Sequence, residues 1–227
     1  MSHNFELVGG DTDGLAFRKP DHSPFTKVER TYLLKELNEL MDNLIHWEDD
    51  GIFQCQLVIK AKNYVLVDEA GKTKIKGSAL KATTKEKALQ EFVRNVIQLL
   101  VHSNQHLVHS MYLEYAKEIL RMPDISRWCS KKTITDAVLK NARTNERRVR
   151  EALKGKPVQQ GDKCFMFFKT PTELCLQENF DGTYDASILL GKLYDTLTVF
   201  ETVLENELKE IPNLALKRNK EIVEGLR

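Results

Sequence analysis

The stretch NFELVGGDTDGLAF, residues 4–17, places two short apolar runs on either side of a turn rich in glycine and aspartate. Residues 4–8 and 15–17 predict two strands, and strands joined by a tight polar turn form a β-hairpin. Asp11 and Asp13 then lie at its tip. Two carboxylates two residues apart point the same way on an extended strand, but a tight turn can direct them differently, so only one need bind a metal. By itself, an Asp-Thr-Asp tripeptide is more often a turn than a metal site.

The hairpin is followed by a predicted helix and a second group of strands. Thr26 and Glu29 have the spacing of a capping box, which opens a helix. One face of that helix carries the leucines at 33, 37, 40 and 44. Residues 53–59, 64–67 and 72–76 then predict strands. The first eighty or so residues are therefore expected to form a half-domain whose sheet is incomplete at one edge.

The rest of the chain predicts mostly helix. Helices are expected over residues 85–101 and 147–154, the second ended by Gly155. Another carries Val108, Met111, Tyr115 and Ile119, and Thr133 and Asp136 frame a further helix start. Residues 164–168 predict a short strand. A long amphipathic helix is expected after it, ended by Pro212, with apolar positions at Ile188, Leu193, Phe200, Val203 and Leu208.

Charge is strongly segregated along the chain, although the net charge of its 227 residues is only +1. Residues 127–163 carry eleven basic and four acidic side chains, whereas residues 173–211 carry two basic and nine acidic ones. Residues 59–81 hold six lysines against two acids. A polyanion binder needs a local basic surface rather than a basic total, so the two basic stretches are candidate nucleic-acid surfaces. Solvated helix and strand faces are the alternative.

Cysteine spacing and hydropathy narrow the class of protein. The four cysteines form no Cys-x-x-Cys pair, and Cys55 and Cys164 are predicted to be reduced core residues. No apolar run is long enough to span a bilayer, and no signal peptide is recognisable. An intracellular protein is expected, cytosolic or nuclear.

Four short motifs follow one another at spacings that resemble family B DNA polymerases. They are Gly10-Asp11-Thr12-Asp13, Lys62-Asn63-Tyr64, Lys74-Ile75-Lys76-Gly77, and the run from Thr83 to Glu91. In that family the first lies on the palm hairpin, the next two on palm strands, and the last resembles the connector into a helix in tailed-phage members. A weaker resemblance to the thumb continues to about residue 208.

The resemblance implies an α+β fold. It consists of a partial antiparallel palm sheet with a packed helix over residues 1–82 and a mostly helical thumb over residues 83–211. Residues 212–227 are expected to be a C-terminal tail.

The resemblance also implies roles for particular residues. Asp13 corresponds to the aspartate that binds Mg²⁺ at a two-metal site, and Asp11 to a supporting carboxylate. Lys62 and Tyr64 correspond to the pair that reaches the primer end from the minor groove, where a lysine can donate to acceptors that every base pair presents. Lys76 is counted with them. Candidate phosphate contacts are Lys131, Lys132, Arg143, Arg147, Arg148 and Arg150.

The sequence departs from the family pattern at a few positions. Gly9 replaces the usual tyrosine and Gly14 the usual serine, which removes a hydroxyl near the metals. Lys81 and Ala82 stand where cellular members often have arginine. These changes bear on full activity rather than on the fold.

The expected partners follow from what this chain lacks. A whole family B polymerase also has an exonuclease domain, fingers and the first palm carboxylate, so we expect an N-terminal polymerase chain, primer–template DNA and deoxynucleoside triphosphates as partners. A sliding clamp is a further candidate, and a membrane is not expected. Polymerases split into two chains occur in some phages and archaea, so this chain is expected to be either one chain of a split polymerase or a fragment of a longer one. The expected location is the cytoplasm, which is the host's cytoplasm if the protein is viral. The alternative function is a non-catalytic duplex-binding scaffold descended from a polymerase. An unrelated α/β binding module is the third possibility.

Overall fold

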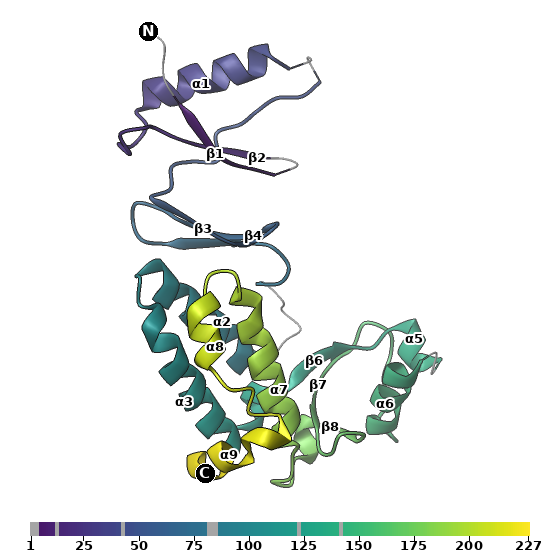
Figure 1. The fold of residues 1–227 in the computed structure, drawn as a ribbon. Helices are drawn as coiled ribbons and strands as arrows, with labels where there is room; N and C mark the ends of the chain where they lie inside the picture. Colours follow the sequence, from purple (N-terminus) through teal and green to yellow (C-terminus); the bar gives the residue numbers. More distant parts are fainter. Residues whose placement is uncertain (1–4, 12–13, 42–43, 81–85, 122–123, 141–142) are drawn as a thin grey trace. The chain divides into compact units, whose positions relative to one another are not determined.

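The chain divides into two compact units, Met1–Lys76 (unit 1) and Gly77–Arg227 (unit 2). The computed structural model describes residues 5–11, 14–41, 44–80, 86–121, 124–140 and 143–227, and Figure 1 labels its elements. Small antiparallel sheets and separate helices make up both units, so the predicted α+β class is confirmed. The names palm and thumb for these parts are still proposals.

Unit 1 begins with the predicted hairpin. Strands β1 (Glu6–Asp11) and β2 (Gly14–Arg18) pair antiparallel, with Asp11 opposite Gly14. The hairpin is tighter than predicted, because β1 runs through both glycines instead of ending at Val8. An irregularity in register between Leu7 and Gly9 accommodates them, as expected where glycine interrupts a strand.

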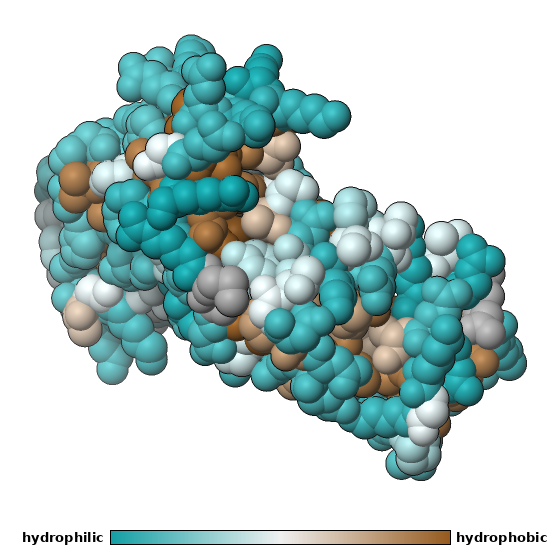
Figure 2. Space-filling model, turned by 90° about the horizontal axis from the view of Figure 1, so that it is seen from below, coloured by the Kyte–Doolittle hydropathy of each residue, from teal (hydrophilic) through white to brown (hydrophobic). Residues whose placement is uncertain are grey.

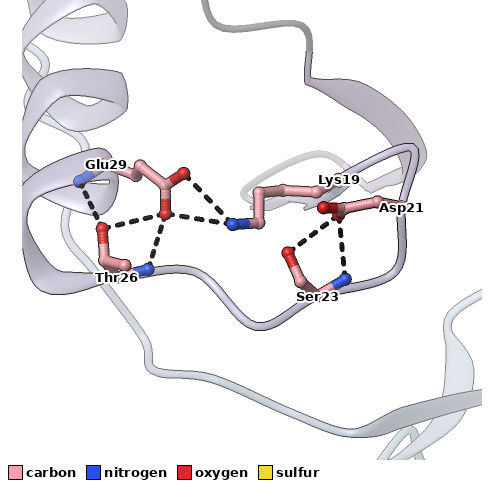
Figure 3. A network of polar contacts seen from close by, with 5 residues as sticks. All are labelled: Lys19, Asp21, Ser23, Thr26 and Glu29. Carbon is pink, nitrogen blue, oxygen red and sulfur yellow. Dashed lines mark hydrogen bonds and ion pairs between the residues drawn. The ribbon is translucent and has the colours of Figure 1, made fainter.

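Helix α1 (Lys27–Glu39) starts at the predicted capping box. Thr26 Oγ1 accepts a hydrogen bond from the Glu29 backbone N–H at 3.2 Å, and Glu29 Oε2 accepts one from the Thr26 N–H at 2.7 Å. Lys19 Nζ reaches the same carboxylate at 3.1 Å, and Figure 3 shows this network beside the turn closed by Asp21 and Ser23. The carboxylate therefore ties the helix start to the chain that follows β2.

The predicted apolar face of this helix is wrong in its second half. Helix α1 ends at Glu39, so Leu40 and Leu44 lie beyond it, 80% and 94% exposed. None of the described residues of α1 is fully buried. In the last turn of α1, the Asn38 side chain hydrogen bonds both backbone groups of Trp47: its amide N–H donates to the Trp47 carbonyl at 3.1 Å, and its Oδ1 accepts from the Trp47 N–H at 2.6 Å.

A three-stranded antiparallel sheet completes unit 1. Its strands are β3 (Cys55–Lys60), β4 (Asn63–Val67) and β5 (Thr73–Lys76), with β4 in the centre. Val65, Leu66 and Val67 of the central strand are buried. Cys55 is exposed at the start of edge strand β3, so its predicted place in the core is wrong.

A helical core of unit 2 lies among α2 (Lys87–Val101), α3 (Val108–Leu120) and α7 (Ala186–Leu197), which contact one another. Phe92, Tyr112 and Leu193 are fully buried there. The Tyr112 hydroxyl donates to the Pro212 carbonyl at 3.0 Å, and burial raises the pKa of Tyr112 to about 12.

In the view from below, hydrophilic residues cover most of the surface and hydrophobic ones show in patches between them (Figure 2).

The predicted long C-terminal helix is broken into pieces. Helix α7 gives way to the 3-10 turn η3 (Thr198–Phe200), and α8 (Glu205–Glu210) follows. Thr196 and Thr198 donate their hydroxyls to backbone carbonyls at Lys192 and Asp195, and such bonds compete with regular helix among β-branched residues. Beyond Pro212, η4 (Lys217–Asn219) and α9 (Lys220–Leu226) follow, and α9 contacts α3.

A small sheet forms a second core in unit 2: its central strand matches the strand predicted at residues 164–168, whereas its two outer strands were not predicted. Strands β6 (Ser130–Thr133), β7 (Lys163–Phe168) and β8 (Leu174–Leu176) pair in that order, after the short helix α4 (Ile125–Trp128). Helices α5 (Asp136–Leu139) and α6 (Thr144–Ala152) pack on one face of it. Short η1 (Gln105–Leu107) and η2 (Gln177–Asn179) complete the unit.

Candidate nucleic-acid interface and metal site

The β1–β2 hairpin brings the Gly10–Asp13 motif to its tip. Asp13 lies outside the described residues, as does the side chain of Asp11, so the direction of both carboxylates is still a prediction. A Cβ on Gly14 would meet no described atom within 4 Å, and one on Gly9 would meet only the Gln56 side chain at 3.7 Å. Neither glycine is therefore required by close packing within the described residues.

The donor chemistry of the tip suits a hard cation, because carboxylate oxygens are the ligands that Mg²⁺ prefers. Among the residues that the structure describes, no group of three or more His, Cys, Asp or Glu could hold a metal. Asp13 is not one of those residues. A two-metal site would also need carboxylates beyond Asp11 and Asp13.

The three-stranded sheet brings Tyr64 and Lys76 together. They are direct cross-strand partners on β4 and β5, and Val58 of β3 is opposite Tyr64 on its other side. Directly opposed residues share a face, with Cβ atoms about 5 Å apart. Tyr64 and Lys76 are both half-buried, so this face presents a phenol beside an ammonium group.

Lys62 was predicted to be on a strand, but it is in the turn between β3 and β4. Its φ of 59° puts it in the left-handed region, and its side chain is exposed. An L-residue with a β-carbon adopts this conformation at a cost of about 1 kcal/mol. The turn nevertheless carries the lysine at the end of the sheet, two residues before Tyr64.

Lys74 shares the sheet face of Lys76 but is already paired. Its Nζ lies 2.7 Å from Asp50 Oδ1 and 5.7 Å from the Phe53 ring centroid. The Lys74 hydrogen bond is the main cause that lowers the pKa of Asp50. Lys76 makes no ion pair among the described residues, so it is the cation on this face that is available to a ligand.

The basic stretch of unit 2 forms a stripe along α6. Arg143 directly precedes the helix, and Arg147 and Arg150 are within it. The spacings of four and three residues between these arginines place all three on one side of the helix. All three are exposed, whereas Arg148 lies off the stripe and is half-buried. The opposite side buries Val149 in the core under the sheet.

A shallow pocket of about 590 Å³ adjoins the stripe. Arg147, Arg150, Lys154 and Lys156 line it, together with Glu151. Lys156 pairs with Glu178 at 2.7 Å, so part of its charge is balanced. Lys154 and Lys156 were missed as individual candidates, although both belong to the basic stretch counted in the sequence.

Lys131 and Lys132 point to opposite faces of the β6–β7–β8 sheet, because neighbouring residues of a strand alternate. Lys132 is opposite Cys164, which packs against the core, and Lys131 is opposite Phe165, which is exposed. The two lysines therefore start from different faces of the sheet. Phe165 had been predicted only as part of an apolar strand.

No family model matches this sequence, and no curated protein matches it either. Among solved structures, the chain is similar to the family B DNA polymerase from the hyperthermophilic archaeon Pyrobaculum calidifontis, with a TM-score of 0.64 and 18% sequence identity. The match covers 88% of this chain and 27% of that polymerase chain.

The chain therefore has the fold of part of a family B DNA polymerase, and it spans about a quarter of the one it matches. At this identity the likeness concerns the backbone and does not assign roles to side chains. No helix in the described part of the chain has the length and apolar character needed to cross a membrane.

Proposed function

We propose that this chain is the C-terminal palm and thumb portion of a DNA-directed DNA polymerase, active only with the N-terminal part. Residues 1–82 would supply the palm half, residues 83–211 the thumb, and residues 212–227 a C-terminal extension. The observation that carries the proposal is the backbone likeness to a family B polymerase over 88% of the chain. The β1–β2 hairpin supports it independently, since it ends in the Asp-Thr-Asp motif.

In this proposal Asp13, supported by Asp11, holds Mg²⁺ with a carboxylate of the N-terminal part. Bound Mg²⁺ would polarise the phosphoryl oxygens of the deoxynucleoside triphosphate and keep attacking and leaving oxygens in line. The role of this chain is to place its carboxylates at the hairpin tip. The strands on either side of the motif pair antiparallel as far as Asp11 and Gly14.

The cations of the chain would grip the primer–template. Lys62, Tyr64 and Lys76 would contact the primer end, which fits the common face of Tyr64 and Lys76. Lys131, Lys132, Arg148 and the α6 stripe (Arg143, Arg147 and Arg150) would contact phosphates, which position a duplex without reading its sequence.

Exposed apolar side chains support a protein partner for unit 1. Leu7, Val8 and Leu15 of the hairpin are 59%, 47% and 39% exposed, and Val58 of the neighbouring sheet is 55% exposed. An interface that completes a domain core is expected to bury more than about 2,000 Å². The N-terminal polymerase part is the proposed occupant. A sliding clamp is a further proposed partner. We also propose that the chain comes from a split polymerase of a phage and that it acts in the cytoplasm.

The test is a primer-extension assay with Mg²⁺ and the four deoxynucleoside triphosphates. We expect extension only when this chain is combined with the N-terminal part of the polymerase. Asp13→Ala should lower extension at least about 100-fold, because a catalytic metal supplies several kcal/mol of transition-state stabilisation. Duplex affinity should change less than about twofold, since no phosphate contact is removed.

Asp195→Asn is the matched control, because it removes an exposed carboxylate on α7. If Asp13→Ala extends primers as well as the unchanged chain, the catalytic assignment fails. The non-catalytic duplex-binding scaffold would then be the better description.

A further inference from the structure

The β6–β7–β8 sheet has one covered face and one partly open face. Met166, Leu174 and Leu176 point to the covered face, where they pack against α5 and α6. Since side chains alternate along each strand, Phe165 and Phe167 of the central strand point to the other face. At one end of that face Phe167 is buried, with the Phe180 ring 5.4 Å away in an edge-to-face arrangement.

The other end of this face is open and basic. Phe165 is 40% exposed, and Lys131 is directly opposite it on β6. Lys163 is two residues before Phe165 on the same strand and the same face, opposite Thr133. Neither lysine makes an ion pair with any residue that the structure describes. We define Lys131, Lys163 and Phe165 as the aromatic–lysine face.

An exposed phenyl ring beside two lysines without an ion-pair partner among the described residues does not contribute to the core of this protein. It has the composition of single-strand binding sites, where bases stack on aromatic rings and cations follow the phosphate backbone. Cross-strand partners have Cβ atoms about 5 Å apart, and residues two apart on a strand about 7 Å, so both lysines are near neighbours of the ring.

We infer that the aromatic–lysine face binds single-stranded DNA, with one base stacked on Phe165 and the adjoining phosphates held by Lys131 and Lys163. The inference rests on the proposed nucleic-acid function and adds a second kind of contact to it. A duplex offers this face only phosphates, because its bases are stacked inside. An unpaired strand offers both groups that the face can bind.

The experiment compares three labelled ligands by fluorescence anisotropy with the full chain: a twelve-nucleotide oligothymidylate, an abasic strand of equal length, and a blunt duplex. Phe165→Ala should weaken oligothymidylate binding at least about fivefold, the lower end for one stacked base. The abasic strand and the duplex should change less than about twofold. Phe165→Tyr, which keeps the ring, should bind oligothymidylate like the unchanged chain.

The lysines give a different pattern because they contact phosphates. Lys163→Ala should weaken the oligothymidylate and the abasic strand alike. Lys140→Ala is the matched charge control, since Lys140 is exposed and already paired with Asp136 at 2.7 Å. It should change neither by more than about twofold.

Equal affinities of Phe165→Ala and the unchanged chain for oligothymidylate would overturn the inference. So would equal binding of oligothymidylate and the abasic strand by the unchanged chain, because no base would then be stacked. In either case, retained duplex binding would leave the proposed function standing. If the unchanged chain bound none of the three ligands, the proposed nucleic-acid function would be rejected as well.

Discussion

Lys192 Nζ on α7 lies 2.5 Å from Oε1 of Glu86, the residue that precedes α2. The Glu86 side chain is only 4% exposed, whereas that of Lys192 is 32% exposed. Lys192 also lies 5.4 Å from the ring centroid of Phe168 on β7. One ammonium group thus links the start of the helical core of unit 2 to its small sheet.

Lys192→Ala should destabilise unit 2 by about 1–3 kcal/mol, because it leaves a buried carboxylate without its charged partner. Urea unfolding followed by fluorotryptophan signals would measure this, since Trp128 lies in unit 2 and Trp47 in unit 1. Lys209→Ala, which breaks the exposed pair with Glu205, should cost less than about 0.5 kcal/mol. Equal effects of the two substitutions would contradict the structural role of Lys192.

The capping box predicts an acid-sensitive unit 1. The Thr26 backbone N–H, then its hydroxyl, then Lys19 lower the pKa of Glu29 from 4.5 to about 2. Because the folded pKa lies below the ordinary value, the stabilisation is present above pH 4.5 and is lost as pH falls towards 2. Glu29→Gln should reduce this pH dependence at the Trp47 signal. Glu39→Gln, which removes an exposed carboxylate at the end of the same helix, should preserve it.

The stripe on α6 predicts a steep salt dependence of duplex binding. Each neutralised phosphate contributes about −0.9 to the slope of log affinity against log salt concentration. Replacing Arg143, Arg147 and Arg150 together by alanine should therefore make the slope shallower by about 2–3. Lys35, Lys209 and Lys220 provide a matched triple control, since each is exposed and paired within its own helix. An unchanged slope in the stripe variant would exclude α6 from the interface.

Lys62 allows function and turn geometry to be separated. Asparagine tolerates the left-handed region, so Lys62→Asn should keep the turn and the unfolding free energy while removing the cation. In the reconstituted polymerase we expect primer extension to slow about tenfold, within the roughly 1–3 kcal/mol of a base contact. Lys60→Ala, an exposed lysine on β3, serves as the control. Equal extension rates would show that Lys62 does not touch the primer end.

Many of the elements around the candidate site could be predicted from local sequence, because they depend on interactions between residues close together in the chain. The β1–β2 hairpin, the Thr26–Glu29 capping box and helices α2 and α3 follow from turn residues and from apolar periodicity. The basic stretches could also be counted. Whether Asp13 binds a metal is still a prediction, because that residue lies outside the described part of the chain.

The sequence by itself determined these local elements and the segregation of charge along the chain, whereas the tertiary structure alone decided which cations share a surface. Ser130 bonds to the Met166 carbonyl across 36 positions, and no local pattern indicates that pairing. In the register of this β6–β7 pairing, Lys131 lies on the open face beside Phe165 and Lys132 lies on the opposite face. Since a strand's side chains alternate with every residue, a shift of one position in this distant pairing would have exchanged the two lysines.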